Sequence, residues 1–481
     1  MTGLVSTPPG PAAGPARRSV GDSSTAVTLV VCGGLAGLAI LSGSALGNGS
    51  KAAVVLPLAA GLGLLLAGLA ASRFGTYVLL MLALRSSIDL AKLSGPAAGT
   101  TESPASRALD PASLFAVLFL AASALWLAGE YRRTGLPGSR LRTALVCFVV
   151  TCGLSVVGAA HKSAGAMQTM RIGAAVAMFV VLEQLARREG GIRRILVAVY
   201  ASAVFPLAFT TVTFLAGHGR TETKGALDRA TGPFSQSNEF GRYLMVLVVM
   251  GVALYPHLER RFRRPLAVLL GASSIFLLLT YTRTALIGSA VGLLVVGFIQ
   301  SKRVIVGLAV VAAIGLAVVP GAAGRFTDLV SSDSATASSN SGNSLEWRFG
   351  YWTEILPLAN KNPVTGIGIN GTQYETDQEK QPHNDFLRAY VESGLVGLGA
   401  YIAALAGMVG LGIRAVRSSV RGTLERGAAA GFLGTAVAFV AVSAVANVIS
   451  NVVVLWYLFA YAAVAAAIAH QPAIPTRKLE A

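Results

Sequence analysis

PLAVLLGASSIFLLLTYTRTALIGSAVGLLVVGFIQ, residues 265–300, carries a single charged side chain, Arg283. A continuous helix over this stretch would be about 54 Å long at 1.5 Å per residue, whereas the hydrocarbon core of a bilayer is about 30 Å thick. The stretch must therefore fold back on itself, and it predicts two membrane-spanning helices joined near Thr280–Thr284. Each arm of about 16 residues reaches only about 24 Å, so we expect Arg283 to lie somewhat below the outer membrane surface.

The chain as a whole is also rich in apolar residues and poor in charged ones. Of its 481 residues, 54% are hydrophobic and 13% are charged, whereas soluble domains have about 25% charged residues. The predicted fold class is all-α, a polytopic membrane protein with about 12–14 transmembrane helices and one large extracytoplasmic loop that contains short helices. Arg85 and Asp89 interrupt one run, 75–91, which is why the number is a range. The predicted spans are 26–46, 52–71, 75–91, 112–129, 143–160, 164–186, 195–216, 238–256, 266–281, 284–300, 304–321, 394–411, 427–447 and 451–469.

The basic residues set the predicted orientation. They cluster in short linkers between apolar runs, as they do in cytoplasmic loops, and this places the N-terminus in the cytoplasm. The net charge of +17 is thus a topological signal, because a nucleic-acid surface would gather the charge into one patch. The predicted parts are a disordered cytoplasmic tail over 1–25, an N-terminal transmembrane region over 26–321, an extracytoplasmic catalytic loop over 322–393, C-terminal transmembrane helices over 394–470 and a cytoplasmic tail over 471–481.

The long outward loop changes character along its length. Its first part is poor in apolar residues, which predicts a mobile segment. A helix should follow and should stop before Pro363, and its apolar face would suit a membrane surface. That face is formed by Leu345, Phe349, Trp352 and Leu356. The glycine-rich GIGINGT at 366–372 predicts turns.

Arg283 is the first candidate for a functional role. An arginine held below the membrane surface is costly unless it meets water, an anion or a partner. The alternative is an interfacial arginine whose guanidinium reaches up to lipid head groups. Arg229 and Arg348 lie on the same side of the membrane, and arginine binds phosphate through paired hydrogen bonds that lysine cannot make. Each alone is more often a solvated or lipid-phosphate contact, but together they favour an anionic substrate.

His383 is the second candidate. If Pro382 is a first-turn residue, His383 lies in the first turn of a helix that Gly394 breaks. The positive end of the helix dipole disfavours the imidazolium form there, and a neutral imidazole is what a general base requires. The alternative is a polar surface histidine near a helix start.

The sequence gives no indication of a metal site, a cofactor or a disulfide framework. The three cysteines, Cys32, Cys147 and Cys152, lie within apolar stretches and are expected to be small packing residues. The four other histidines lack a metal-ligand neighbour at i+3 or i+4. An Asp-x-Asp motif for a nucleotide sugar is also missing.

Several segments together resemble the O-antigen ligase and polymerase family of bacterial envelopes. They are RATGPFSQSNEFGRYL at 229–244, LLLTYTRTALIGSAVGLL at 277–294, WRFGYWTEILPLANKNPVTGIGINGTQ at 347–373 and PHNDFLRAYVESGLVGLGAYI at 382–402. The similarity covers residues 197–411, and the earlier spans match only in hydropathy.

The resemblance implies a metal-independent glycosyltransferase in the cytoplasmic membrane, with its active site on the extracytoplasmic face. Its donor would be an undecaprenyl-diphosphate-linked glycan, and its acceptor a glycan or a lipid of the envelope. By resemblance to the family, Arg229 and Arg283 would bind the donor diphosphate, and His383 would activate the acceptor hydroxyl. Arg348 would be a further arginine whose role is less defined. Asp385 would orient a neighbour or balance charge. The expected partners are these substrates and membrane lipids, and not nucleic acid.

Elementary chemistry agrees with that reading. A sugar diphosphate is already activated, so an enzyme needs cations for the leaving diphosphate and a base on the opposite face of the anomeric carbon. Direct displacement would invert that centre. A polymerase that joins repeat units shares the donor half of the reaction and stays open as an alternative. A transporter or lipid-glycan flippase would place ionisable groups near the bilayer midplane, whereas here they gather at the outer face.

Overall fold

The computed structural model describes residues 51–94, 111–224, 227–318, 345–376 and 379–470. The chain divides into two compact units, residues 1–77 and 78–481. The predicted span 26–46, the first part of the long loop and the two tails lie outside the described residues.

The first unit contains the predicted span 52–71, which forms α2 (Lys51–Ser72). Arg73 separates this helix from α3 (Phe74–Leu84), and the rings of Phe74 and Tyr77 lie 5.8 Å apart at the start of α3. The predicted run 75–91 is α-helical only to Leu84 and continues as the 3-10 helix η1 (Arg85–Ser94). The change falls at the charged residue that interrupts the apolar run.

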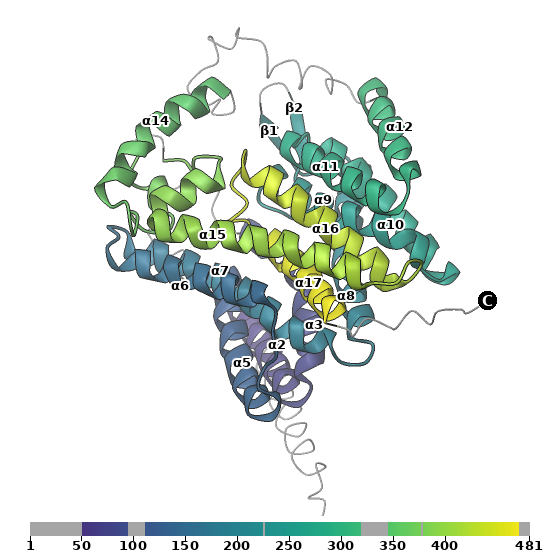
Figure 1. Cartoon of the computed structure of the whole chain (residues 1–481), viewed down its shortest axis with the longest axis horizontal. Helices are drawn as coiled ribbons and strands as arrows, with labels where there is room; N and C mark the ends of the chain where they lie inside the picture. The colour runs from purple at the N-terminus through teal and green to yellow at the C-terminus, as the bar shows by residue number, and fades with distance from the viewer. Residues whose placement is uncertain (1–50, 95–110, 225–226, 319–344, 377–378, 471–481) are drawn as a thin grey trace, which may run out of the picture. The chain divides into compact units, whose positions relative to one another are not determined.

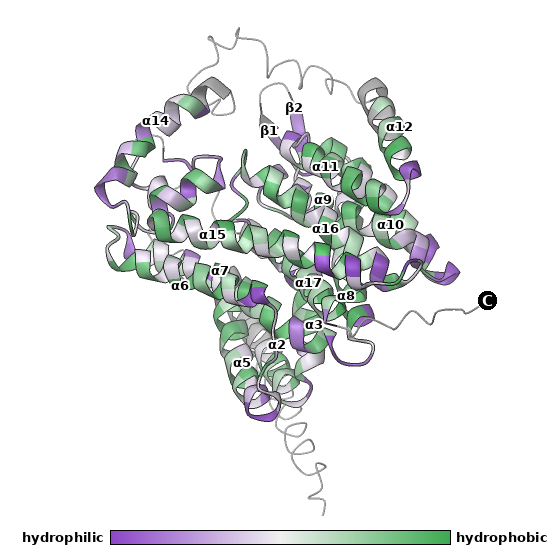
Figure 2. Ribbon diagram, in the orientation of Figure 1, coloured by the Kyte–Doolittle hydropathy of each residue, from purple (hydrophilic) through white to green (hydrophobic). Residues whose placement is uncertain are grey.

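The second unit is built almost entirely of helices. Ten helices in the described part of the chain are long and apolar enough to cross a membrane, and hydrophobic residues predominate along the helical ribbons in Figure 2. The predicted all-α, multi-pass fold is thus confirmed, and one small antiparallel sheet, β1 (Thr221–Lys224) with β2 (Leu227–Ala230), was not predicted. The helices are α5 (Pro111–Thr134), α6 (Arg140–Val157), α7 (Lys162–Ala186), α8 (Gly191–Leu215), α9 (Ser237–Leu254), α10 (Arg260–Leu279), α11 (Arg283–Gln300), α12 (Lys302–Val318), α14 (Leu345–Lys361), α15 (Asp385–Ser418), α16 (Leu424–Ser443) and α17 (Val452–Ala469).

The packing of the second unit centres on α17. All of its residues from Val453 to Ile468 are buried. It packs against α7, α9, α15 and α16, while α15 lies beside α6 and α16 lies beside α11 (Figure 1). A helix that is apolar on every side belongs in the interior of a bundle, so α17 is the helix around which the others are arranged.

The predicted reversal within residues 265–300 is confirmed. α10 ends at Leu279, α11 begins at Arg283, and Thr280–Thr282 form the turn between them. The turn packs on Gly241 near the start of α9, where a Cβ atom would lie only 2.8 Å from the Thr280 hydroxyl. Because Leu270 packs near the other end of α9, against Gly251, α10 runs antiparallel to α9.

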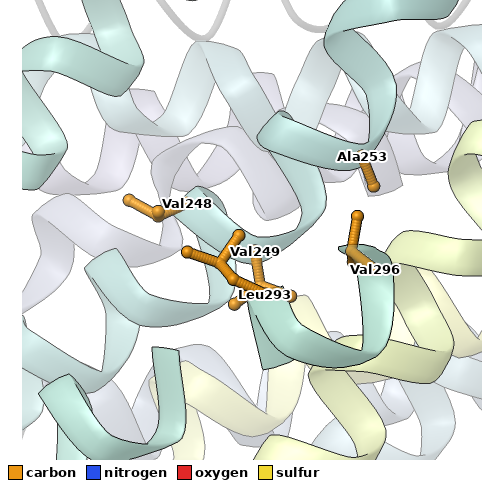
Figure 3. Close-up of a cluster of buried hydrophobic side chains, with 5 residues drawn as sticks. All are labelled: Val248, Val249, Ala253, Leu293 and Val296. Atoms are coloured by element: carbon orange, nitrogen blue, oxygen red, sulfur yellow. The ribbon is translucent and has the colours of Figure 1, made fainter. Parts of the chain in front are cut away.

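The second arm, α11, runs along α9 in the same direction. Gly288 lies against Met245, and Gly292 lies against Val249 one turn further on. The two helices share a cluster of buried apolar side chains, shown in Figure 3, formed by Val248, Val249, Ala253, Leu293 and Val296. α10 and α11 therefore run in opposite directions on either side of α9.

The predicted loop helix is α14, which ends at Lys361, before Pro363. Its buried side is formed by Tyr351, Ile355 and Ala359. On the predicted apolar face, Phe349 is 59% exposed and Leu356 is 42% exposed. The helix is thus apolar on two sides. Phe349 and Leu356 of the predicted face point away from the protein, whereas Trp352 of that face packs against the buried cluster.

The junction between the loop and the last helices is a kink in α15. Gly394 has φ 67° inside this helix, which confirms the predicted break. A Cβ atom there would lie 2.1 Å from the carbonyl oxygen of Val364. The N–H of Leu395 donates to the carbonyl of Pro363 at 2.8 Å. Glycine thus allows the turn after α14 to lie directly on α15.

Candidate active site

The residues 444–451 between α16 and α17, here called the site loop, join the predicted functional segments. Arg348 Nη1 donates to the carbonyl of Val445 at 3.0 Å, and Arg242 Nη1 donates to the carbonyl of Asn447 at 3.0 Å. The side-chain oxygen of Asn447 accepts from the backbone N–H of His383 at 2.8 Å. One short loop therefore brings α9, α14 and the segment before α15 to the same place.

Arg283 and Arg348 lie close enough to repel each other. Arg283 is the first residue of α11, and Arg348 is half-buried on α14. Burial lowers the pKa of Arg348, and the positive charge of Arg283 lowers it further. The positive end of the α11 dipole adds to this unfavourable potential. Two arginines placed this close together form a position suited to bind an anion.

Arg348 and Arg242 each have a buried N–H group without a hydrogen-bond partner in the described part of the chain. In both side chains this group is the Nε–H. The charge of Arg242 interacts with those of Arg348 and Asp385. A buried donor without an acceptor costs roughly 1–3 kcal/mol, so these two arginines are held in place at a cost to stability.

Arg229 is buried beneath the turn that carries Arg283. It is 2% exposed, and its Nε donates to the carbonyl of Thr280 at 2.9 Å. Its Nη2 donates to the side chains of Asn238 at 2.7 Å and Thr282 at 3.0 Å. In this conformation Arg229 holds the α10–α11 turn against the start of α9, and so it fixes the position from which Arg283 projects.

The small sheet secures Arg229 in turn. Glu222 of β1 is the register partner of Arg229 on β2. The Glu222 carboxylate accepts from the backbone N–H and the hydroxyl of Ser237, at 3.1 and 2.7 Å. A carboxylate at a helix N-terminus is favoured by the unpaired N–H groups and the dipole. The hairpin is therefore tied to the first turn of α9.

His383 does not lie in a helical turn, which corrects the prediction made from Pro382. α15 begins at Asp385, and Asn384 is its N-cap, accepting from the N–H groups of Phe386 and Leu387. His383 precedes the cap with φ 53°. Asn384 is the better start signal because its side chain satisfies two N–H groups of the first turn. The backbone of His383 therefore lies two residues before the first residue of α15.

Two side chains of α14 hold the segment that leads to His383. The indole N–H of Trp352 donates to the carbonyl of Pro382 at 2.7 Å. The hydroxyl of Tyr351 contacts the hydroxyl of Thr376 at 3.0 Å and the carbonyl of Lys380. α14 therefore supplies both an arginine and the supports of the histidine segment.

Asp385 fixes the site loop from the other side. Its Oδ2 accepts from the N–H groups of Val448 and Ile449, both at 3.0 Å, and from the hydroxyl of Tyr401 at 3.3 Å. Asp385 is fully buried. These contacts give it the orienting role that was predicted for it, because they set the conformation of the loop that contacts Arg242, Arg348 and His383.

A buried ion pair anchors the glycine-rich turns beneath the site. Arg388 Nε lies 2.9 Å from Glu392 Oε2, and both side chains are 0% exposed. The same guanidinium donates to Gln381 and Asn370 at 3.0 and 3.2 Å, and Glu392 accepts from Asn370 N–H and from Thr372. Gln381 also accepts from Ser450 of the site loop at 3.2 Å. The network thus links α15, residues 370–381 and the site loop.

Arg388→Met is expected to lower the free energy of unfolding by about 3–5 kcal/mol, because it leaves the Glu392 carboxylate buried without its cation. Thermal or denaturant unfolding of the purified protein in detergent would measure the change. The matched control is Arg261→Met, which removes a cation that is 67% exposed beside Glu259 and should cost about 0–1 kcal/mol. Equal effects of the two substitutions would show that the buried network does not stabilise the fold.

The structure brings Arg348 and the His383 segment to one loop. It places Arg283 near enough to Arg348 to lower its pKa, with Arg229 behind the turn that leads to Arg283. Sequence reasoning missed Arg242, although a charged residue inside a predicted span was a usable signal. It also missed Asn447. A lone polar residue between two apolar runs has no periodic pattern, and only the fold shows that it contacts both Arg242 and His383.

The comparisons with known proteins agree with this geometry. Residues 265–402 match the family model described as O-antigen ligase. The match begins at the apolar run that carries Arg283, includes α14 and His383, and ends in α15. No curated protein matches the chain.

Proposed function

We propose that this protein, whose residues 265–402 form an O-antigen ligase domain, transfers a glycan from an undecaprenyl-diphosphate donor to an envelope acceptor. The match supports a multi-pass bacterial membrane glycosyltransferase of the O-antigen ligase or polymerase type. The observation that carries the more specific proposal is the site loop, which contacts Arg348, Arg242 and the His383 segment at once. Cations for a diphosphate and a base for an alcohol are thereby gathered at one place.

The reaction is a direct displacement at the anomeric carbon. The neutral imidazole of His383 accepts the proton of the acceptor hydroxyl while the oxygen attacks the anomeric carbon. The bond from that carbon to the diphosphate oxygen breaks with its electron pair, and undecaprenyl diphosphate leaves. Arg283 and Arg348 stabilise the developing negative charge, and the buried Nε–H of Arg242 adds a third donor. Attack opposite the leaving group inverts the anomeric configuration.

Arg229 takes part through the turn it holds. It donates hydrogen bonds to Thr280, Thr282 and Asn238, so contact with the diphosphate would require it to exchange at least one of them. We assign it to the diphosphate site as the residue that positions Arg283. The site faces the extracytoplasmic side of the cytoplasmic membrane, in line with the distribution of basic residues in the linkers.

A polymerase is the second candidate, and the same site serves it. Both reactions use the same donor and differ in the acceptor, which is a second lipid-linked repeat unit for a polymerase. The described residues contain no feature that favours one acceptor over the other. The products distinguish them, because loss of a polymerase leaves single repeat units, whereas loss of a ligase leaves long lipid-linked chains.

The proposal is tested by reconstitution of the full chain with a synthetic undecaprenyl-diphosphate glycan and a panel of hydroxyl acceptors, followed by mass spectrometry. We expect a new glycosidic linkage of inverted configuration. Vesicles that move the donor between leaflets without any new linkage would replace the proposal with transport. Placement of residues 283 and 383 on opposite sides of the membrane by accessibility labelling would contradict the shared site.

Trp352→Phe tests the support of His383. Loss of the hydrogen bond to Pro382 should lower kcat about 3–10-fold and leave donor affinity unchanged. In a His383→Asn background the same substitution should have no further effect, because it acts through the base. Trp126→Phe, a substitution beneath Arg188 on α5, is the control and should leave kcat unchanged. An equal loss in both backgrounds would contradict the positioning role.

A further inference from the structure

Two membrane-spanning helices, α8 and α10, begin beside each other at the end of α9 that lies away from the candidate active site. Arg193 Nη2 near the start of α8 lies 3.4 Å from Oε1 of Glu259, the residue that precedes α10. Leu254, the last residue of α9, follows Arg242 of the candidate site by 12 residues, which is about 18 Å at 1.5 Å per residue. The starts of α8 and α10 therefore form a surface separate from the proposed donor site.

Glu259 and Phe262 hold two arginines together at this surface. One oxygen of the Glu259 carboxylate contacts Arg193, and the other lies 2.8 Å from Arg261 Nε. Both guanidinium groups also lie on the Phe262 ring, at 4.9 and 4.8 Å from its centre. The two arginine side chains stay exposed in this arrangement. One carboxylate and one ring thus keep two exposed guanidinium groups close to each other.

The neighbouring residues add further positive charge. Residues 189–194 and 259–264, here called the basic surface, contain six arginines and two glutamates, so four positive charges remain after both carboxylates are counted. Among the described residues, Arg194, Arg260 and Arg264 are exposed and form no ion pair. The loop before α16, a helix that packs beside η2 (Tyr255–His257), also carries more arginine than glutamate. An anion bound here would relieve the repulsion between these cations.

Exposed apolar side chains continue both helices beyond the arginines. On α8, Val197 follows Arg193 by about one turn and is 56% exposed. On α10, Val268 follows Arg264 by about one turn and is 72% exposed, and Ile275, two turns further on, is also exposed. Residues four and seven apart lie on one face of a helix. The same faces are therefore basic at the helix starts and apolar along the membrane spans.

We infer that the basic surface binds the phosphate head group of an anionic phospholipid, whose acyl chains lie along the exposed apolar faces of α8 and α10. Arginine pairs well with phosphate oxygens, and basic pockets between spanning helices on the cytoplasmic side bind anionic head groups. The basic linkers are expected on that side. A soluble phosphate or an acidic peptide would leave Val197 and Val268 uncovered, so the apolar continuation favours a lipid. The inference does not depend on the transfer reaction proposed above.

The test measures binding of phosphatidylglycerol to the full chain, purified in neutral detergent, by native mass spectrometry with phosphatidylcholine as the neutral reference. We expect a preference for phosphatidylglycerol, and its apparent affinity at the tightest site should fall about fivefold for each arginine removed in the pair Arg194→Gln and Arg264→Gln. A basic residue near an anionic surface contributes about 1 kcal/mol, which corresponds to that factor. If the double variant does not fold, the two substitutions are measured singly.

The pair Arg414→Gln and Arg417→Gln is the matched control. Both arginines are exposed in the last turns of α15. The loop after α15 leads to α16, whose start packs beside η2, so the control removes the same charge at the same end of the spans. Phosphatidylglycerol affinity at the tightest site should be unchanged. An equal loss in both double variants would show attraction to net charge alone and would overturn the inference.

A second arm distinguishes a lipid from a soluble anion. The thermal midpoint is followed as inorganic phosphate replaces chloride at constant ionic strength, since a ligand that binds only the folded state raises it. We expect the rise that depends on Arg194 and Arg264 with phosphatidylglycerol and not with inorganic phosphate. An equal rise with inorganic phosphate would reassign the surface to a soluble anion. A preference for phosphatidylglycerol that is absent, or that is unchanged in Arg194→Gln with Arg264→Gln, would also contradict the lipid site.

Discussion

His383→Asn is expected to reduce the turnover of glycan transfer by about 10²–10⁴-fold, the usual contribution of a general base. The carboxamide cannot accept the acceptor's proton at neutral pH. Asparagine is chosen because His383 has φ 53°, a conformation that asparagine tolerates better than alanine. The backbone N–H that donates to Asn447 is retained, so the site loop should keep its conformation.

The measurement separates the base from the donor site. Single-turnover transfer measures the rate of the chemical step. Binding of the undecaprenyl-diphosphate glycan in detergent measures the donor affinity that the arginines provide. We expect donor affinity to be unchanged in His383→Asn. His218→Asn, a change at an exposed loop histidine, is the control and should transfer at the normal rate. Normal turnover in His383→Asn would remove His383 from the mechanism and leave the arginine site without a base.

The sequence was informative where a residue departs from a strong local pattern. Arg283 is the one charge in an apolar run, so both the helix reversal and the candidate site could be predicted from it. Gly394 could be predicted as a break because it stands where a polar stretch meets an apolar run, and glycine there commonly interrupts a helix. The thickness of the bilayer and the backbone geometry of glycine are the same in every membrane protein, so these two features can be predicted without knowledge of the fold.

The parts that were missed depend on contacts between distant segments. The face of α14 that packs on the protein contains Tyr351, Ile355 and Ala359, which have the same helical spacing as the predicted face. Periodicity alone does not distinguish a buried face from one that meets a membrane. The hairpin β1–β2 consists of two four-residue strands and is held by Glu222 and Arg229, so no local run of apolar residues indicates it.

Asn447 and Asn384 illustrate the same limit at the site. Both are asparagines next to apolar segments, and in the structure one caps α15 while the other joins Arg242 to the His383 segment. A proline two residues earlier suggested a different start for α15, and the cap side chain decides the boundary. The proposed roles of the site residues thus came from residue type and stay predictions, whereas the contacts that hold these residues could be seen only in the fold.

Arg283→Ala is expected to weaken donor binding and to lower turnover by about 10²–10³-fold, as removal of a donor to a developing anion does elsewhere. Arg283 stands at the positive end of α11 and its charge lowers the pKa of Arg348, so it adds to a positive potential that favours a bound diphosphate. Binding of the undecaprenyl-diphosphate glycan in detergent and single-turnover transfer would measure the two losses.

Three comparisons make this result specific. Arg229→Ala should lower the midpoint and the activity together, because it removes three hydrogen bonds that hold the turn. Arg283→Lys should recover only part of the activity, since an ammonium group cannot bridge two phosphate oxygens. Arg303→Ala, at an exposed position of α12, should change neither quantity. A lower midpoint in Arg283→Ala with unchanged donor affinity would mean that Arg283 stabilises the fold and that the diphosphate is bound elsewhere.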